Sequence, residues 1–266
     1  MRNRFLLFLL VFFYWVSSGE GFAGTLQDVK ERGKLIAGVK TDFPPFGFVD
    51  KKGVNKGFDI DIVKALSKGL FGKEEAVEFV AVTTGNRIAF LVSGKIDMIA
   101  ATMTITEERK RKVAFSNPYF ISGQLIMVQG DSKITKYPDL AGKKVATIKG
   151  SIGNIAIGEL VPTAERVQFE RNFEALQALK KRRVEAFVQD DILLFDLVRK
   201  NPGLRIAGLE PFRPAPYGLA VRKRDKEWLD FINSTLAKMM ETGEYERLLE
   251  RWFGLEAKAL WRLFKK

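Results

Sequence analysis

The chain has 266 residues, of which 46% are hydrophobic, and a formal net charge of +12. This length suits one large domain or two small ones, and because the chain has no cysteine we expect neither disulfides nor a lipid anchor on an N-terminal cysteine. The basic charge could serve nucleic acid or an anionic membrane, but the Lys and Arg residues are scattered and no aromatic stacking motif accompanies their short clusters, so we expect a solvated surface and no nucleic-acid partner.

Residues 1–23 have the pattern of a signal peptide. Arg2 and Arg4 precede an apolar run from Phe5 to Val16, and small residues follow up to Ala23. The run is shorter than the roughly 20 apolar residues that cross a bilayer. We therefore expect cleavage after Ala23 and a free periplasmic protein.

Short apolar segments then alternate with amphipathic ones. The sequence predicts strands at residues 35–39, 77–82 and 96–100, with helices at 59–70 and 86–92 between them. This rhythm is typical of βαβ units, in which helices cover both faces of a mostly parallel sheet.

A second α/β unit follows the first. We expect strands at 144–148, 166–169 and 184–188 and helices at 154–160, 173–180 and 192–199. The proline-rich segment 211–216 suits neither a helix nor a central strand. Two further helices, at 226–240 and 245–252, close the predicted order of elements.

Polar groups follow the strand at 96–100 directly. Thr104 and Arg109 could bind a carboxylate there, because a guanidinium can donate to both carboxylate oxygens. The same segment is also typical of a helix start with Thr106 as N-cap. Both interpretations can hold, since Arg109 lies one turn beyond that cap.

Two segments of the second unit also end strands with polar groups. The turn at residues 150–154 opens a helix, so its N–H groups could bind an anion, although most turns of this kind have no ligand. Asp190 and Asp191 follow the strand at 184–188. One of them can cap the next helix, which leaves the other free for a ligand.

Taken together, these motifs closely resemble the bacterial extracellular solute-binding proteins that serve polar amino-acid importers. The motifs are TDFPPF at 41–46, GFDID at 57–61, TITEER at 104–109, FSNPYF at 115–120, VQD at 188–190, YGLAV at 217–221 and WFG at 252–254. The resemblance implies an α/β, two-lobed periplasmic-binding-protein fold of type II, with hinge strands at about 119–123 and 213–217. Lobe 1 would comprise residues 24–122 and 214–266, and lobe 2 residues 123–213.

The same resemblance implies a set of binding residues for one free amino acid. Arg109, Thr104 and the backbone of Thr102 would hold the α-carboxylate from lobe 1, and Asp190 would hold the ammonium from lobe 2. The remaining contacts would come from the backbone at Ser151 and Ile152 and from the ring of Phe43, which would cover the ligand.

Two cations bear on the specificity for the ligand side chain. Lys40 stands where relatives that bind basic or neutral amino acids often carry an aspartate. Arg87 starts a predicted helix, where a positive charge is unfavourable for the helix itself. The pair resembles the one with which glutamate- and aspartate-binding members hold the distal carboxylate; alternatively, both are ordinary solvated cations. Asp59 and Asp61, by contrast, are interpreted as acids of a helix start.

We therefore predict a periplasmic, monomeric glutamate- or aspartate-binding protein that delivers its ligand to a membrane ABC permease, with no cofactor, metal or enzymatic activity. Alternatives are glutamine or a basic amino acid as ligand, a sensory role, and a cyclohexadienyl dehydratase acting on prephenate or arogenate. The absence of histidine, the commonest catalytic base, disfavours the enzyme. We expect residues 256–266 to pack as a terminal helix; as a basic aromatic tail they could instead contact membrane or permease.

Overall fold

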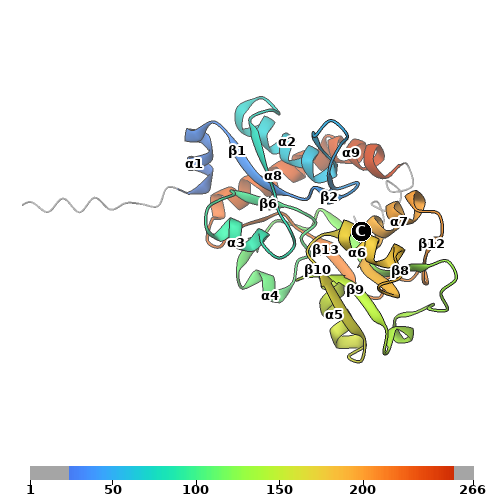
Figure 1. Ribbon diagram of the computed structural model, residues 1–266. Helices are drawn as coiled ribbons and strands as arrows, with labels where there is room; N and C mark the ends of the chain where they lie inside the picture. The colour runs from blue at the N-terminus through green and yellow to red at the C-terminus, as the bar shows by residue number, and fades with distance from the viewer. Residues whose placement is uncertain (1–23, 255–266) are drawn as a thin grey trace, which may run out of the picture.

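The computed structural model describes residues 24–254, so the predicted signal peptide and the basic tail lie outside it. Figure 1 shows two α/β lobes, one above the other, joined by two strands. This confirms the predicted two-lobed fold. Within the described residues, no helix is both long and apolar enough to span a membrane.

Lobe 1 is built on a five-stranded sheet in the order β5-β1-β6-β14-β7. Its strands are β1 (Leu35–Val39), β5 (Val77–Ala81), β6 (Met98–Ala100), β7 (Val113–Phe115) and β14 (Ala220–Arg222). Its helices are α1 (Thr25–Arg32), α2 (Phe58–Phe71), α3 (Arg87–Val92), α4 (Glu107–Lys110), α8 (Lys226–Glu241) and α9 (Glu244–Phe253). A small antiparallel sheet of β2 (Asp42–Phe43), β3 (Gly47–Val49) and β4 (Asn55–Lys56) lies beside it.

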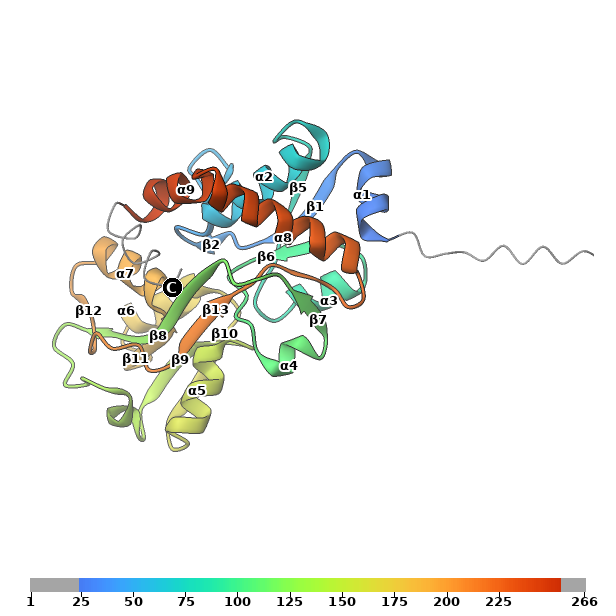
Figure 2. The same ribbon diagram turned by 180° about the vertical axis from the view of Figure 1, so that it is seen from behind.

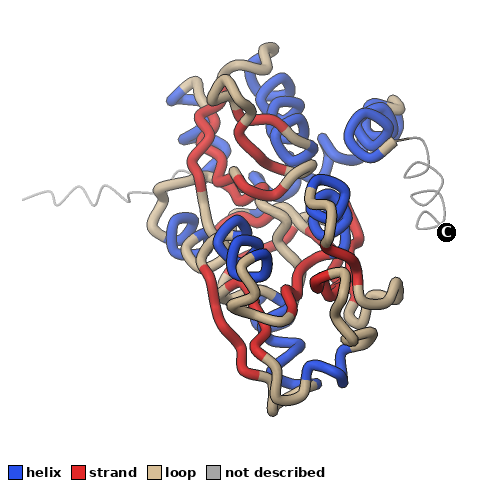
Figure 3. The backbone as a smooth tube through the Cα atoms, turned by 45° about the vertical axis from the view of Figure 1, so that its right-hand side comes forward, coloured by secondary structure: helices blue, strands red, loops and turns tan. Residues whose placement is uncertain are grey.

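Lobe 2 is built on the strand order β10-β9-β11-β8-β12. Its strands are β8 (Phe120–Gln129), β9 (Lys144–Ile148), β10 (Glu165–Phe169), β11 (Ala186–Asp190) and β12 (Leu204–Ile206). Helices α5 (Ile152–Leu160), α6 (Asn172–Lys180) and α7 (Asp191–Lys200) and the 3-10 turn η1 (Tyr137–Leu140) surround it. Helices cover the sheets of both lobes, as the tube in Figure 3 makes visible.

Both sheets are mixed, whereas the sequence analysis expected mostly parallel ones. In lobe 1, β1 pairs in parallel with β5 and β6, but β14 pairs antiparallel with β6 and β7. In lobe 2, β9 is parallel to β10 and β11, but β8 is antiparallel to β11 and β12. The antiparallel strands are those that the chain adds as it enters lobe 2 and returns to lobe 1, which the local βαβ pattern does not encode.

Two antiparallel strands connect the lobes. β8 pairs with β13 (Pro214–Tyr217), from Phe120 opposite Tyr217 to Gly123 opposite Pro214. Figure 2 shows them side by side between the lobes. They coincide with the two crossings inferred from the resemblance, and we retain the lobe boundaries 24–122, 123–213 and 214–266 as a proposal.

An aromatic cluster fixes the hinge strands to lobe 1. The ring centroid of Phe46 lies 4.9 Å from that of Phe120, 5.4 Å from that of Tyr217 and 5.1 Å from that of Phe253. Buried aromatic rings contribute large apolar areas and favour edge-to-face contacts of this kind. One end of the hinge is therefore part of the lobe 1 core.

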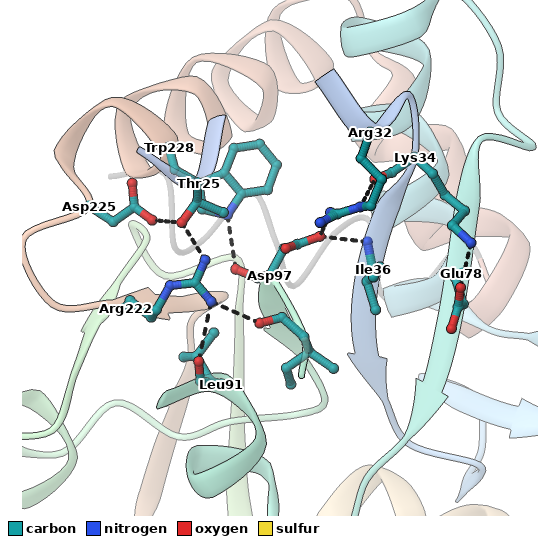
Figure 4. A network of polar contacts seen from close by, with 11 residues as sticks. Thr25, Arg32, Lys34, Ile36, Glu78, Leu91, Asp97, Arg222, Asp225 and Trp228 are labelled. Carbon is teal, nitrogen blue, oxygen red and sulfur yellow. Dashed lines mark hydrogen bonds and ion pairs between the residues drawn. The ribbon is translucent and has the colours of Figure 1, made fainter. Parts of the chain in front are cut away.

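A polar network ties α1 and α8 to the end of the lobe 1 sheet away from the hinge (Figure 4). Arg222 donates to the hydroxyl of Thr25 at 2.5 Å, and that hydroxyl donates to Asp225. Asp97 accepts from the backbone N–H of Ile36 at 2.8 Å, and its own carbonyl accepts from the indole of Trp228 at 3.1 Å. These bonds stabilise lobe 1 and lie far from the hinge.

Candidate ligand-binding site

A cavity of about 20 Å³ lies where the two lobes meet. It is lined by Phe43, Thr84, Arg87, Thr102, Thr104 and Arg109 from lobe 1 and by Ser151, Ile152, Gln189 and Asp190 from lobe 2. The fold thus brings together every predicted site residue except Lys40, which instead donates to the lining residue Thr84. A larger hollow of about 460 Å³ on the outside of lobe 2, around Tyr137, Leu209 and Phe212, contains none of them.

Arg109 crosses from one lobe toward the other. Its Nη1 donates to the carbonyl of Thr104 at 2.8 Å, and its Nη2 donates to the carbonyl of Gly150 in lobe 2 at 3.0 Å. Thr106 accepts from the backbone N–H of Arg109 at 3.2 Å, which confirms it as the N-cap of α4. The cap and the two carbonyls orient the guanidinium at the cavity wall.

Thr102 has an unusual backbone conformation, with φ at +47°. Its N–H donates to the carboxylate of Asp59 at 3.0 Å, and the hydroxyl of Tyr119 donates to the same carboxylate at 2.7 Å. Burial raises the pKa of Asp59 to about 7, although both hydrogen bonds lower it. Asp59 does lie in the first turn of α2, as expected, but it also holds the wall of the site. The sequence indicates this burial only through the position of Asp59 between the apolar residues Phe58 and Ile60.

Lobe 2 contributes the start of α5. Ser151 is the N-cap, and its hydroxyl accepts from the backbone N–H of Asn154 at 3.1 Å. Ile152 is the first helical residue and lines the cavity with its side chain buried. The N–H of Ser151 donates to the carbonyl of Ile148 at 2.9 Å, so the N–H of Ile152 and the hydroxyl proton of Ser151 are the donors that this turn can offer.

Asp190 ends β11 at the cavity and is 6% exposed. Gln124 Nε2 and the Tyr217 hydroxyl, both on hinge strands, donate to its carboxylate. Burial raises the pKa of Asp190, while these two hydrogen bonds lower it. Asp191 accepts from the hydroxyl of Ser122 at 2.5 Å and does not line the cavity.

Two buried cations lie on the lobe 1 side. Arg87 is 2% exposed and lines the cavity; its Nη1 donates to the carbonyl of Ala101 at 2.5 Å, and its Nε has no hydrogen-bond partner among the described residues. Burial lowers its pKa to about 9, so it stays charged at neutral pH. Lys40 is 3% exposed and donates to Thr84 Oγ1 at 3.0 Å, and burial lowers its pKa to about 8. Neither is the solvated cation of the alternative interpretation.

Thr84 and Gln189 also line the cavity, although neither was predicted to do so from the sequence. Thr84 follows β5 and Gln189 lies near the end of β11, which is where open α/β sheets place their ligands. Gln189 Nε2 donates to Asn172 Oδ1 at 2.8 Å, and its Oε1 accepts from the backbone N–H of Asp190 at 3.0 Å. The rule that open α/β sheets bind ligands at the ends of their strands would have predicted both residues.

A comparison with protein families matches residues 35–255 to the model of the bacterial extracellular solute-binding proteins, family 3. The chain belongs to this family. The match includes all the lining residues of the cavity, and it supports a protein that works outside the cytoplasm.

Individual relatives differ in the ligand that they are named for. The chain is 40% identical over 238 residues to the ABC transporter glutamine-binding protein GlnH of Bacillus subtilis, covering 89% of this chain and 87% of the relative. It is 27% identical over 240 residues to the glutamate/aspartate import solute-binding protein of Salmonella typhimurium, covering 86% and 79%. A solved structure, the ancestral amino acid-binding protein AncCDT-1, a precursor of cyclohexadienyl dehydratase, matches with 39% identity and a TM-score of 0.78, over 87% of this chain and all of that one.

Proposed function

We propose that the protein binds free glutamate or aspartate between its lobes in the periplasm and delivers it to a membrane ABC permease. The observation that carries the proposal is Arg87, a buried charged guanidinium at the cavity wall whose Nε lacks a hydrogen-bond partner among the described residues. Membership of an extracellular solute-binding family and similarity to amino-acid-binding proteins support the transport role.

The α-groups of the ligand have one partner of opposite charge each. The carboxylate binds Arg109, Thr104 and the N–H of Ile152, and the ammonium binds Asp190. The N–H of Thr102, which was predicted to bind the carboxylate, donates to Asp59 instead, so the carbonyl of Thr102 is the backbone group left for the ammonium. A bound ammonium lowers the pKa of Asp190 again and keeps it ionised, because an opposite charge favours the charged form. Since the ligand contacts both lobes, it favours the closed form by its differential affinity.

The side chain of the ligand then meets Arg87. With Arg109 and Asp190 paired to the α-groups, Arg87 is the remaining charge of the lining, and Lys40 donates to Thr84. A distal carboxylate pairs with this guanidinium, whereas an apolar side chain would leave it buried and uncompensated, which is costly. A basic side chain would add a like charge and is disfavoured.

Glutamine is the second candidate, favoured by the 40% identity to a glutamine-binding protein. Its amide oxygen can accept a hydrogen bond from Arg87 but supplies no counter-charge. A hydrogen bond to a charged group contributes about 1.5–3 kcal/mol, and glutamine can form one as well. The difference between the two ligands is the counter-charge that glutamine does not supply to the buried guanidinium. We therefore expect glutamine to bind about tenfold more weakly than glutamate, and the reverse order would favour glutamine as the ligand.

The test starts from the chain from Gly24 onward, unfolded and refolded to remove ligand that copurifies with it. Thermal shift with all twenty amino acids, followed by calorimetry of those that stabilise the protein, should select glutamate and aspartate. Arg87→Met should abolish this preference, whereas Arg111→Met, on the exposed side of the same lobe, should preserve it. Selection of a basic or apolar amino acid would refute the role of Arg87.

We propose no enzymatic role, and the likeness to AncCDT-1 is to a protein described as amino acid-binding. Incubation with prephenate tests this directly. Appearance of phenylpyruvate absorbance above the uncatalysed rate would contradict the proposal.

A further inference from the structure

The two lobes also touch outside the cavity, where β2 of lobe 1 lies beside the start of α6 in lobe 2 (Figure 1). Asp42 Oδ2 accepts from the backbone N–H of Asn172 at 2.9 Å, and the carbonyl of Asp42 accepts from Asn172 Nδ2 at 3.4 Å. Neither residue lines the cavity. The contact therefore joins the lobes without a ligand atom.

The position of Asn172 explains why a carboxylate is effective there. Asn172 is the first residue of the nine-residue helix α6, whose first N–H groups have no partner within the helix. A carboxylate at this end satisfies one N–H and interacts favourably with the helix dipole. Lobe 1 thus supplies a cap to a lobe 2 helix, and this cap is lost when the lobes separate.

The contact continues toward the ligand groups. Asn172 is 3% exposed, and its Oδ1 accepts from Gln189 Nε2 at 2.8 Å. Gln189 in turn accepts from the backbone N–H of Asp190 at 3.0 Å, and both Gln189 and Asp190 line the cavity. A chain of hydrogen bonds therefore runs from Asp42 in one lobe to Asp190 in the other.

We infer that Asp42 is a positioning residue that holds the closed form and, through Asn172 and Gln189, keeps Asp190 oriented. It sets how long the ligand stays bound without touching the ligand. This role goes beyond the proposed function and does not depend on which amino acid is bound. Because affinity scales with the population of the competent state, loss of Asp42 weakens binding of every ligand equally.

The test measures association and dissociation rates by stopped flow, with whichever amino acid the wild-type protein prefers. Asp42→Ala should raise the dissociation rate at least tenfold, leave the association rate within about twofold, and preserve the ratio of glutamate to glutamine affinity. Asn172→Ala keeps the backbone N–H that donates to Asp42 but removes the bond to Gln189, so it should also raise the dissociation rate and preserve the ratio of affinities. Asp50→Ala is the matched control, since the carboxylate of Asp50, in the same lobe, accepts from the backbone N–H groups of Lys52 and Val54 in its own turn and, among the described residues, from none in lobe 2. The rates of this variant should equal those of the wild type.

A further readout separates this role from a merely structural one. The contact exists only between lobes, so Asp42→Ala should leave the thermal midpoint of the ligand-free protein unchanged. An unchanged dissociation rate would overturn the inference. So would a changed glutamate-to-glutamine ratio, because Asp42 raises the pKa of Lys40 and would then be acting through that charge. A ligand panel that selects another amino acid would overturn the proposed function alone, and the rate comparison would be made with that amino acid.

Discussion

Two buried carboxylates, one in each lobe, have nearly the same surroundings. Asp59 in lobe 1 accepts from the hydroxyl of Tyr119, and Asp190 in lobe 2 accepts from the hydroxyl of Tyr217. Burial raises the pKa of both. Both tyrosines adjoin the hinge, since Tyr119 precedes β8 and Tyr217 ends β13.

The difference between them lies in the other partner. The second bond of Asp59 comes from the backbone N–H of Thr102, so this carboxylate completes its own lobe. The second bond of Asp190 comes from the side chain of Gln124, and its carboxylate faces the cavity. Burial and a perturbed pKa are therefore poor markers of a ligand group by themselves, and exposure to the cavity distinguishes the two.

The largest expected effect is that of Asp190→Ala on binding. The ligand ammonium would be buried without a counter-charge, and removal of one partner of a buried pair costs about 3–5 kcal/mol. Calorimetry should show affinity reduced at least a hundredfold. The free energy of unfolding should fall as well, because the hydroxyl of Tyr217 and the amide of Gln124 lose their acceptor. Unchanged affinity would show that Asp190 is, like Asp59, a structural group.

Asp59→Ala should act on stability rather than through a direct contact with the ligand. It leaves the N–H of Thr102 and the hydroxyl of Tyr119 buried and unpaired, and each such group costs about 1–3 kcal/mol. The free energy of unfolding from urea titration should fall by about 2–5 kcal/mol. Tyr119→Phe removes one of the two bonds and should fall between this variant and the wild type. A loss of ligand affinity without any loss of stability would contradict the assignment.

The sequence predicted most of what local patterns control. The strands at 35–39 and 144–148 agree with β1 and β9, and Thr106 caps its helix as expected. The positions of Thr104 after β6 and of Asp190 at the end of β11 follow from the same logic, because helices and strands alternate with a clear period, and Arg109 lies in the first turn of the helix that Thr106 caps.

Contacts between segments that are distant in the sequence could not be predicted from these local patterns. The role of Asp59 depends on Thr102, forty-three positions away, and the contact of Asp42 depends on Asn172 in the other lobe. Antiparallel β14 reaches its sheet only after the chain has built lobe 2. These are consequences of the return of the chain through the hinge, which no single segment encodes.

The stability of the protein should depend on pH through the buried groups of lobe 1. The pKa of Asp59 is about 7 in the folded protein and about 3.9 in the unfolded chain. Between these values the folded protein holds a proton that the unfolded chain has lost, so stability falls as the pH rises from about 4 to about 7. The slope contributed by one proton is at most about 1.4 kcal/mol per pH unit.

Lys40 acts with the opposite sign. Its pKa is about 8 when folded and about 10.4 when unfolded, so the unfolded chain binds the extra proton and stability rises with pH across that interval. Urea unfolding at a series of pH values should therefore show a free energy of unfolding that changes less between about pH 4 and 7 in Asp59→Asn, and less between about pH 8 and 10.4 in Lys40→Met, than in the wild type. A pH dependence of the free energy of unfolding identical to that of the wild type would show that neither group titrates in these ranges.

The smallest effect concerns the strained residue that Asp59 holds. A β-branched residue at positive φ is unfavourable, whereas glycine adopts this region at little cost. Thr102→Gly should therefore raise the free energy of unfolding by up to about 1 kcal/mol, because relief of the backbone strain outweighs the greater freedom of glycine in the unfolded chain. Binding weakens because the wall of the cavity loses a rigid residue. Thr104→Gly is the control, because Thr104 has no positive φ, and it should lower stability by about 1 kcal/mol. If both variants lose stability equally, the conformation of Thr102 stores no strain. If Thr102→Gly alone gains stability and loses affinity, lobe 1 keeps a strained residue for binding, whereas the ligand group of lobe 2 lies in ordinary extended backbone.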